Sequence, residues 1–303
     1  KDRDLMGELL GGQSYFQCVE ENLSYEQICL ENQRETEWDK QRFDVLEEQT
    51  VETSAAVKQE EVKKQEDVRV EKLKKTKDSG YLLQNFYIVD STTSVTKKQF
   101  QVEKLLGANM KLVKEPGKKQ VLIYHTHAAS EGFADSTKKE SDSVIGVGDE
   151  LTKALEKKGY GVIHDRTKYD LVQGRLDRSL AYNQALASVE KILQKNPSIQ
   201  VVIDLHRDSV GKGKHTYTTI NGKKCAIVMF FNGMSRSKNG PIPYLYNENL
   251  TDNLAFSLQL KCLAMERYPG FTKPIYLKGY RYNLHLRKRS LLIELGNENN
   301  TVE

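Results

Sequence analysis

Three short apolar runs constrain the fold of this chain most strongly, because each has the composition of a buried strand and each ends in side chains that bind metals or transfer protons. The runs span residues 121–127, 201–208 and 290–296, and they carry His125 with His127, His206, and Glu294, respectively. In an open parallel sheet the carboxyl ends of the strands face a shared crevice. We therefore expect these side chains to converge on one small site.

Strands and helices are expected to alternate from residue 120 onward. The expected strands cover residues 120–125, 160–164, 200–205 and 290–295, and the expected helices cover about 144–158, 174–195 and 252–267. Two further strands, 216–220 and 225–231, are joined by Asn221-Gly222, a pair typical of tight hairpin turns. This order predicts an α/β fold with a mostly parallel twisted sheet, helices on both faces and one hairpin at an edge.

The first quarter of the chain has a different composition. Residues 31–78 are almost entirely charged or polar and cannot bury a core by themselves. We therefore expect a helical or flexible charged stalk over 1–78. A small extension over 79–116 should pack on a catalytic domain at 117–303, with a strand at 85–89 and a helix at 99–106.

The charge balance argues against a nucleic-acid partner. The chain has 46 basic and 42 acidic groups and a net charge of +4, without a basic stripe interleaved with aromatic residues. A weak preference for anionic polymers, such as cell wall, is compatible with this balance. No apolar run is long enough to span a bilayer, and the chain begins without methionine, so we expect that a membrane anchor or leader has been removed.

The histidines at the strand ends predict a zinc site. His127 and His206 fit zinc ligation together with one carboxylate and an open position. Glu131, four residues after His127, would share a helical face with it, whereas Glu140 would be presented by the start of the next helix. Both carboxylates remain candidates. Of His125 and His127 we expect His127 to be the ligand, since it lies farther out of the sheet, and His125 to contact substrate or support the ligands.

Glu294 is the candidate catalytic residue. A glutamate flanked by large apolar side chains has a raised pKa, and near neutrality it can act as general base and then general acid. The alternative is a structural salt bridge with a nearby arginine, for which the sequence offers Arg281, Arg287 and Arg289.

We expect structural or recognition roles for three other sets of residues. Arg175 and Arg178 are expected to cap a helix or to pair with acidic neighbours, and His164 is expected to lie in a turn. Residues 280–283, Tyr-Arg-Tyr-Asn, are typical of a loop that contacts sugar or peptide.

Four motifs together resemble the SpoIIP family, the stage II sporulation proteins of endospore-forming bacteria. They are VLIYHTHAASEGF, VGDELTKALEKKGYGVIHDRT, VVIDLHRDS and LLIELGNENNT, and the resemblance covers about residues 80–303. It implies a zinc amidase-like fold and a zinc-dependent N-acetylmuramoyl-L-alanine amidase that cleaves peptidoglycan during engulfment, with a second, endopeptidase activity. It also implies SpoIID and SpoIIM as partners and an extracytoplasmic protein anchored in the membrane at the sporulation septum and the engulfing membrane.

The resemblance carries over to individual residues. His127 and His206 match the family's histidine ligands, and Glu294 matches its catalytic glutamate. The family motif places a glutamate two residues after His-Thr-His, whereas three residues intervene here before Glu131, so Glu131 and Glu140 both remain candidates.

Two other functions are alternatives to the amidase. A zinc carboxypeptidase or endopeptidase would use the same residues on peptides, and a catalytically inactive wall-binding scaffold would use none of them. Arg207, next to His206, is a candidate for holding a substrate carboxylate.

Overall fold

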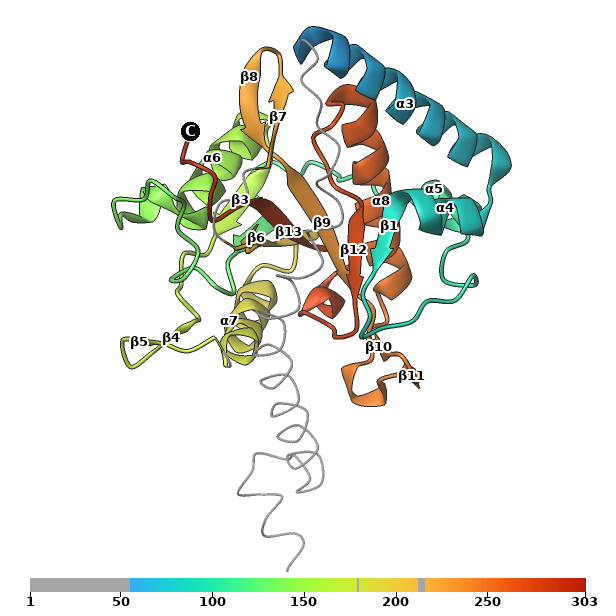
Figure 1. Cartoon of the computed structure of the whole chain (residues 1–303). Helices are drawn as coiled ribbons and strands as arrows, with labels where there is room; N and C mark the ends of the chain where they lie inside the picture. Colours follow the sequence, from blue (N-terminus) through green and yellow to red (C-terminus); the bar gives the residue numbers. More distant parts are fainter. Residues whose placement is uncertain (1–54, 179, 212–215) are drawn as a thin grey trace, which may run out of the picture. The chain divides into compact units, whose positions relative to one another are not determined.

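The computed structural model describes residues 55–178, 180–211 and 216–303. The expectations for residues 1–54 lie outside these ranges. Figure 1 shows a central sheet with helices packed on it. The helices are α3 (Ala55–Thr76), α4 (Ser79–Phe86), α5 (Val102–Gly107), α6 (Val144–Lys157), α7 (Ala181–Lys195) and α8 (Leu250–Arg267).

The central sheet has seven strands in the order β1-β12-β9-β13-β6-β2-β3. Their bounds are β1 Tyr87–Val89, β2 Lys119–Tyr124, β3 Gly161–His164, β6 Val201–Asp208, β9 Val228–Gly233, β12 Ile275–Lys278 and β13 Arg289–Asn297. Every neighbouring pair is parallel except β9 and β13. The predicted α/β class with a mostly parallel sheet is therefore confirmed, and the carboxyl ends of β13, β6, β2 and β3 lie at one edge.

Side-chain alternation along the strands explains why helices cover both faces of this sheet. On β2, Leu122 and Tyr124 pack against the buried stripe of α7, whereas Val121 and Ile123 face the side that α6 covers. Helix α8 packs against β9 and β13. The predicted site residues His206 and Glu294 lie near the carboxyl ends of β6 and β13.

Asn221-Gly222 forms the predicted hairpin turn, with positive φ at both residues (51° and 79°). It joins β7 (Tyr217–Ile220) to β8 (Lys223–Ala226). The second expected strand, 225–231, is split: its later part is β9, which is fully buried and leaves the hairpin to enter the central sheet.

The expected helix over 174–195 begins later than predicted, at Ala181. Residues 171–176 instead form a short hairpin of β4 (Leu171–Val172) and β5 (Arg175–Leu176), which takes up the first residues of the expected helix. Gln173 and Gly174 make the turn between them with φ values of 50° and 78°. A glycine inside a helical pattern was therefore a turn signal here.

The described part of the expected stalk is a packed helix. Val70 and Leu73 of α3 are 2% and 0% exposed and belong to the same core as α8, within a compact unit that spans residues 51–303. The expected extension is also integral, because β1 pairs with β12 at the edge of the central sheet. Residues 55–116 therefore pack on the same unit as the central sheet, since a few apolar side chains on a polar helix suffice to dock it.

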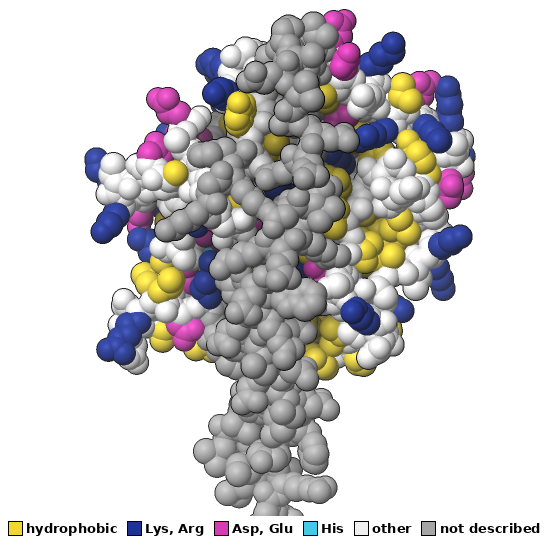
Figure 2. Space-filling view, viewed as in Figure 1, with side chains coloured by type: hydrophobic (Ala, Val, Ile, Leu, Met, Phe, Trp, Pro, Cys, Tyr) yellow, Lys and Arg dark blue, Asp and Glu magenta, His cyan; other side chains and the backbone are white. Residues whose placement is uncertain are grey.

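The shorter elements lie around the sheet. They are the hairpin of β10 (Arg236–Ser237) and β11 (Gly240–Pro241) and the single turns η2 (Glu140–Asp142), η3 (Pro243–Leu245) and η4 (Leu284–Leu286). In the face shown by Figure 2, basic and acidic side chains are both scattered over the described surface, as the mixed composition predicts. Within the described ranges, no helix has the length and apolar character needed to cross a bilayer.

A buried lysine of α8, Lys261, is expected to make the stability of the protein depend on pH. Lys261 is 4% exposed, and its Nζ donates to the carbonyl and the hydroxyl of Thr272 at 2.7 and 2.8 Å. Burial lowers the pKa of Lys261 to about 8, while the charge of Glu66 partly opposes this shift.

Stability should therefore rise between pH 8 and pH 10, because the unfolded chain binds a proton at Lys261 that the folded chain has released. We expect this group to contribute up to about 3 kcal/mol to the rise in the free energy of unfolding. Urea unfolding at pH 7, 8, 9 and 10 should show a steeper rise for the wild type than for Lys261→Met. Equal slopes in the two proteins would contradict this assignment.

Candidate metal centre

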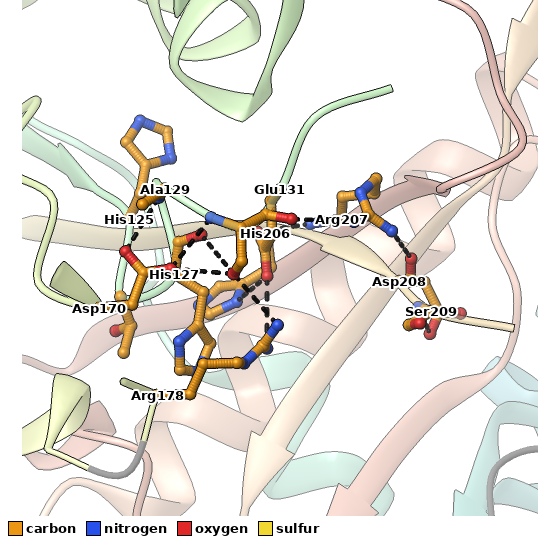
Figure 3. Close-up of polar contacts among 12 residues, drawn as sticks. His125, His127, Ala129, Glu131, Asp170, Arg178, His206, Arg207, Asp208 and Ser209 are labelled. Atoms are coloured by element: carbon orange, nitrogen blue, oxygen red, sulfur yellow. Dashed lines mark hydrogen bonds and ion pairs between the residues drawn. The ribbon is translucent and has the colours of Figure 1, made fainter. Parts of the chain in front are cut away.

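The sheet register places the predicted residues at adjacent strand ends. Glu294 on β13 is paired in register with His206 on β6, and Asp204 on β6 is paired with Tyr124, the last residue of β2. Directly paired residues of neighbouring strands point to the same face. The chain then turns out of β2 and brings His127 to the same position (Figure 3).

His127 and His206 form the centre of the site. Their ring centroids are 5.3 Å apart with the ring planes at 77°, and the two residues are 5% and 2% exposed. His127 Nδ1 is buried and makes no hydrogen bond to any described residue. His206 Nε2 lies 2.8 Å from Asp204 Oδ1, in an ion-pair contact that lacks hydrogen-bond geometry.

Glu131 lies beside these histidines, whereas Glu140 does not. Glu131 is 2% exposed, its Oε1 lies 3.2 Å from His206 Nδ1, and its Oε2 accepts the N–H of Arg207 at 3.0 Å. Glu140, in contrast, is paired on the surface with Arg166 and Lys168 at 3.0 and 2.8 Å. Of the two candidate carboxylates, the structure therefore brings Glu131 to the histidines.

Two buried aspartates hold the turn that carries His127 and Glu131. Asp204 accepts the N–H and the hydroxyl of Thr126 at 2.9 and 2.6 Å. Asp170, which is 0% exposed, accepts the N–H of Ala129 at 2.9 Å and the N–H and hydroxyl of Ser130 at 3.0 and 2.8 Å. Each aspartate thus replaces hydrogen bonds that the chain loses where it leaves β2.

Glu294 is the most strongly perturbed carboxyl group at the site. Burial raises the pKa of Glu294 to about 8, although the charge of His206 acts in the opposite direction. Its Oε2 is buried and has no hydrogen-bond partner among the described residues. The arginines proposed as structural partners donate to backbone carbonyls instead: Arg281 to Tyr246, Arg287 to Ile199, and Arg289 to Lys111.

The two central histidines have opposite pKa shifts. Burial, with the charges of Arg178 and His206, lowers the pKa of His127 well below its ordinary value. For His206, burial also favours the neutral ring, but the carboxylates of Asp204 and Glu131 outweigh it and raise the pKa well above its ordinary value. The site therefore combines one neutral imidazole with one imidazole embedded in negative charge.

His125 belongs to a separate pair on the α6 side of the sheet. Its Nδ1 lies 2.8 Å from the carbonyl of Leu205, and its Nε2 lies 2.8 Å from Nε2 of His164. His164 Nδ1 in turn contacts Asp149 of α6 at 2.9 Å. Burial lowers the pKa of both histidines, that of His125 to about 4. His164, which we expected only in a turn, is thus the partner of His125.

The two arginines near the site have different surroundings. The Arg207 side chain is only 10% exposed and donates to the carbonyls of Asp208 and Ser130 at 2.9 and 3.2 Å. The Arg178 side chain is 50% exposed, and its Nη2 lies 3.7 Å from Glu131 Oε1. Arg207 therefore braces the turn around Glu131, whereas Arg178 reaches the site from solvent (Figure 3).

The donor set suits zinc in its chemistry. Two imidazoles and one carboxylate are the ligands of many hydrolytic zinc sites, and buried polar atoms without partners are unusual unless an ion or water satisfies them. As the side chains stand, no three His, Cys, Asp or Glu residues of the described chain are arranged to hold a metal ion. Metal binding by His127, His206 and Glu131 would therefore require His206 to exchange its present contact with Glu131 or Asp204.

Comparison with known proteins agrees with the four motifs. A model of the family described as Stage II sporulation protein P (SpoIIP) matches residues 8–303. The stage II sporulation protein P of Bacillus subtilis (strain 168) is 32% identical over 205 residues, which are 61% of this chain and 47% of that protein. The chain thus spans about half the length of this curated relative. Since the family model covers nearly the whole chain, the chain belongs to the stage II sporulation protein P family and is a sporulation protein.

Proposed function

We propose that this protein is a zinc-dependent N-acetylmuramoyl-L-alanine amidase that remodels peptidoglycan during engulfment. The observation that carries the proposal is the position of Glu294, whose Oε2 is buried and which is paired in register with His206, the histidine that contacts His127 and Glu131. Two imidazoles and a carboxylate that could hold zinc, beside a carboxyl group of raised pKa, are an arrangement suited to hydrolysis of an unactivated amide.

The residues present would divide the work of amide hydrolysis. His127, His206 and Glu131 would hold the metal, which when bound would polarise the scissile carbonyl and lower the pKa of water at the site. Glu294 would accept a proton from the attacking water and deliver it to the nitrogen of the departing L-alanine amine. The carbon–nitrogen bond breaks in that step, leaving a lactyl carboxylate on the glycan and a free amine on the stem peptide.

Burial of Glu294 supports this role energetically. A carboxyl group with a pKa of about 8 is a stronger base than an ordinary glutamate and still able to donate a proton near neutrality. A nearby cation would lower that pKa, because it stabilises the ionised form. The group would therefore alternate between its two forms at working pH.

The wider cellular role is proposed on the family's properties. An endopeptidase activity on peptide cross-links, an extracytoplasmic and membrane-anchored location, and partnership with SpoIID and SpoIIM belong to this proposal.

Product analysis on purified peptidoglycan tests the reaction class. An amidase should release stem peptides with a free amino-terminal L-alanine and leave glycan strands without new reducing ends. A carboxypeptidase would release single amino acids, and a scaffold would bind the wall and release nothing. Mass spectrometry of the soluble fraction separates these outcomes.

Asp170 offers a test of the support beneath the site. In Asp170→Asn an uncharged amide replaces a carboxylate that accepts three hydrogen bonds from Ala129 and Ser130. We expect the free energy of unfolding to fall by about 1–3 kcal/mol. We also expect zinc affinity to fall roughly 10- to 100-fold, because the turn that presents His127 and Glu131 would loosen.

Metal titration and urea unfolding would measure both effects. Asp142→Asn is a suitable control, since Asp142 also accepts hydrogen bonds, from Thr137 and Ser141, but on the surface. Equal zinc affinity in the two variants would show that Asp170 does not position the ligands.

A further inference from the structure

Arg178 is the positive side chain of the site whose role the proposed reaction leaves open. It lies between β5 and α7 and contacts Ser130 and Glu131 in the turn that follows β2. Its guanidinium contacts Glu131, which is 2% exposed, while half of its own side chain remains in solvent. The side chain therefore extends from solvent to the buried Glu131.

The contacts of Arg178 within the protein are weak. Nη1 donates one hydrogen bond, to Ser130 Oγ at 3.2 Å, and the 3.7 Å contact with Glu131 is too long for a hydrogen bond. Both oxygens of Glu131 already have closer partners, His206 and the Arg207 N–H. A guanidinium carries five N–H donors, so most of the donors of Arg178 are not used by the described residues.

Arg207 does not compete for the same role. Its guanidinium is 10% exposed and is engaged by the backbone carbonyls of Asp208 and Ser130 and by Glu298. Arg178, rather than Arg207, is therefore the better candidate for holding a substrate carboxylate, because its side chain is exposed and has N–H donors available.

We propose that Arg178 determines substrate specificity by binding a free carboxylate on the stem peptide, close to the scissile amide. The inference rests on the proposed amidase function and names the substrate class that this site selects. A planar guanidinium pairs with a carboxylate through two parallel hydrogen bonds, which neither an amide nor a hydroxyl can match. A stem peptide whose nearby carboxylate has been converted to an amide should therefore bind less well.

The position of Arg178 favours ground-state binding over stabilisation of the reacting oxygen. Groups that stabilise a developing oxyanion act in a water-excluded environment, and half of the Arg178 side chain is in solvent, whereas Oε2 of Glu294 is buried. Its loss should accordingly raise KM more than it lowers kcat.

Two soluble muramoyl peptides that differ only in this carboxylate, free in one and amidated in the other, provide the test. The wild type should prefer the free carboxylate by roughly 10- to 100-fold in kcat/KM. Arg178→Gln should lose this preference through a higher KM for the free carboxylate, and Arg178→Lys should retain part of it. Arg175→Gln, an exposed arginine of the same segment, should behave as the wild type.

Binding of the same two peptides by calorimetry separates this inference from the proposed reaction. A preference in affinity that Arg178→Gln abolishes would support the inference even if no peptide were cleaved. Cleavage without any preference, or an equal loss on both peptides in Arg178→Gln, would overturn it and leave the amidase proposal intact. Zinc content should be the same in all variants.

Discussion

Glu294→Gln is expected to lower the rate of stem-peptide release by roughly 10²- to 10⁴-fold, because glutamine cannot accept the proton of the attacking water. The substitution keeps the size of the side chain. Burial already holds the pKa of Glu294 at about 8, so the carboxyl group is largely neutral at pH 7 in the metal-free protein, and its replacement by a neutral amide should leave the fold stable.

Rates on purified peptidoglycan, together with zinc content and thermal unfolding, would test this expectation. Zinc content and the melting temperature should remain close to those of the wild type while the rate falls. A variant that retains most of the activity would remove Glu294 from the reaction. A variant that loses both zinc and the fold would assign Glu294 a structural role instead.

Glu131→Gln is expected to abolish zinc binding and hydrolysis together, while the matched Glu140→Gln should retain both. Glu131 is buried against His206 and the Arg207 N–H. Glu140 lies on the surface in ion pairs with Arg166 and Lys168, where the loss of one carboxylate should change stability by less than about 1 kcal/mol.

Elemental analysis of the two variants beside the wild type would decide between the carboxylates. The site described above is supported if Glu131→Gln binds zinc at least tenfold more weakly than the wild type and Glu140→Gln keeps the wild-type zinc content. The opposite pattern would mean that Glu140 leaves its surface partners and enters the site when metal binds.

The core of the site could be predicted from the sequence because it follows from strand geometry. The apolar runs before His206 and Glu294 fix two buried parallel strands, and strands in one register bring these two side chains together. Likewise, the alternation of short apolar runs with amphipathic helices gave the α/β class correctly.

The choice between Glu131 and Glu140 could not be predicted, because it depends on contacts distant in sequence. The turn after β2 takes its shape from Asp170 and Asp204, which lie 40 to 78 residues from the N–H groups whose hydrogen bonds they accept. The separate pairing of His125 with His164 has the same origin, since it depends on how β2 and β3 lie side by side.

The packing of helix α3 and the position of Arg178 could not be predicted from the sequence. Helix α3 has a largely polar sequence, yet Val70 and Leu73 dock it on the core that includes α8. Arg178 was expected to pair with an acidic neighbour, and its exposed position above Glu131 emerged only from the fold.

Zinc content measured beside hydrolysis tests the central claim most directly. The wild-type protein should bind about one zinc ion per chain and release stem peptides from peptidoglycan, lose both after chelation, and regain both when zinc is restored. His206→Ala should show neither zinc nor release at any zinc concentration that saturates the wild type. Release of stem peptides by the fully chelated protein, or a wild type that takes up no zinc, would contradict the account.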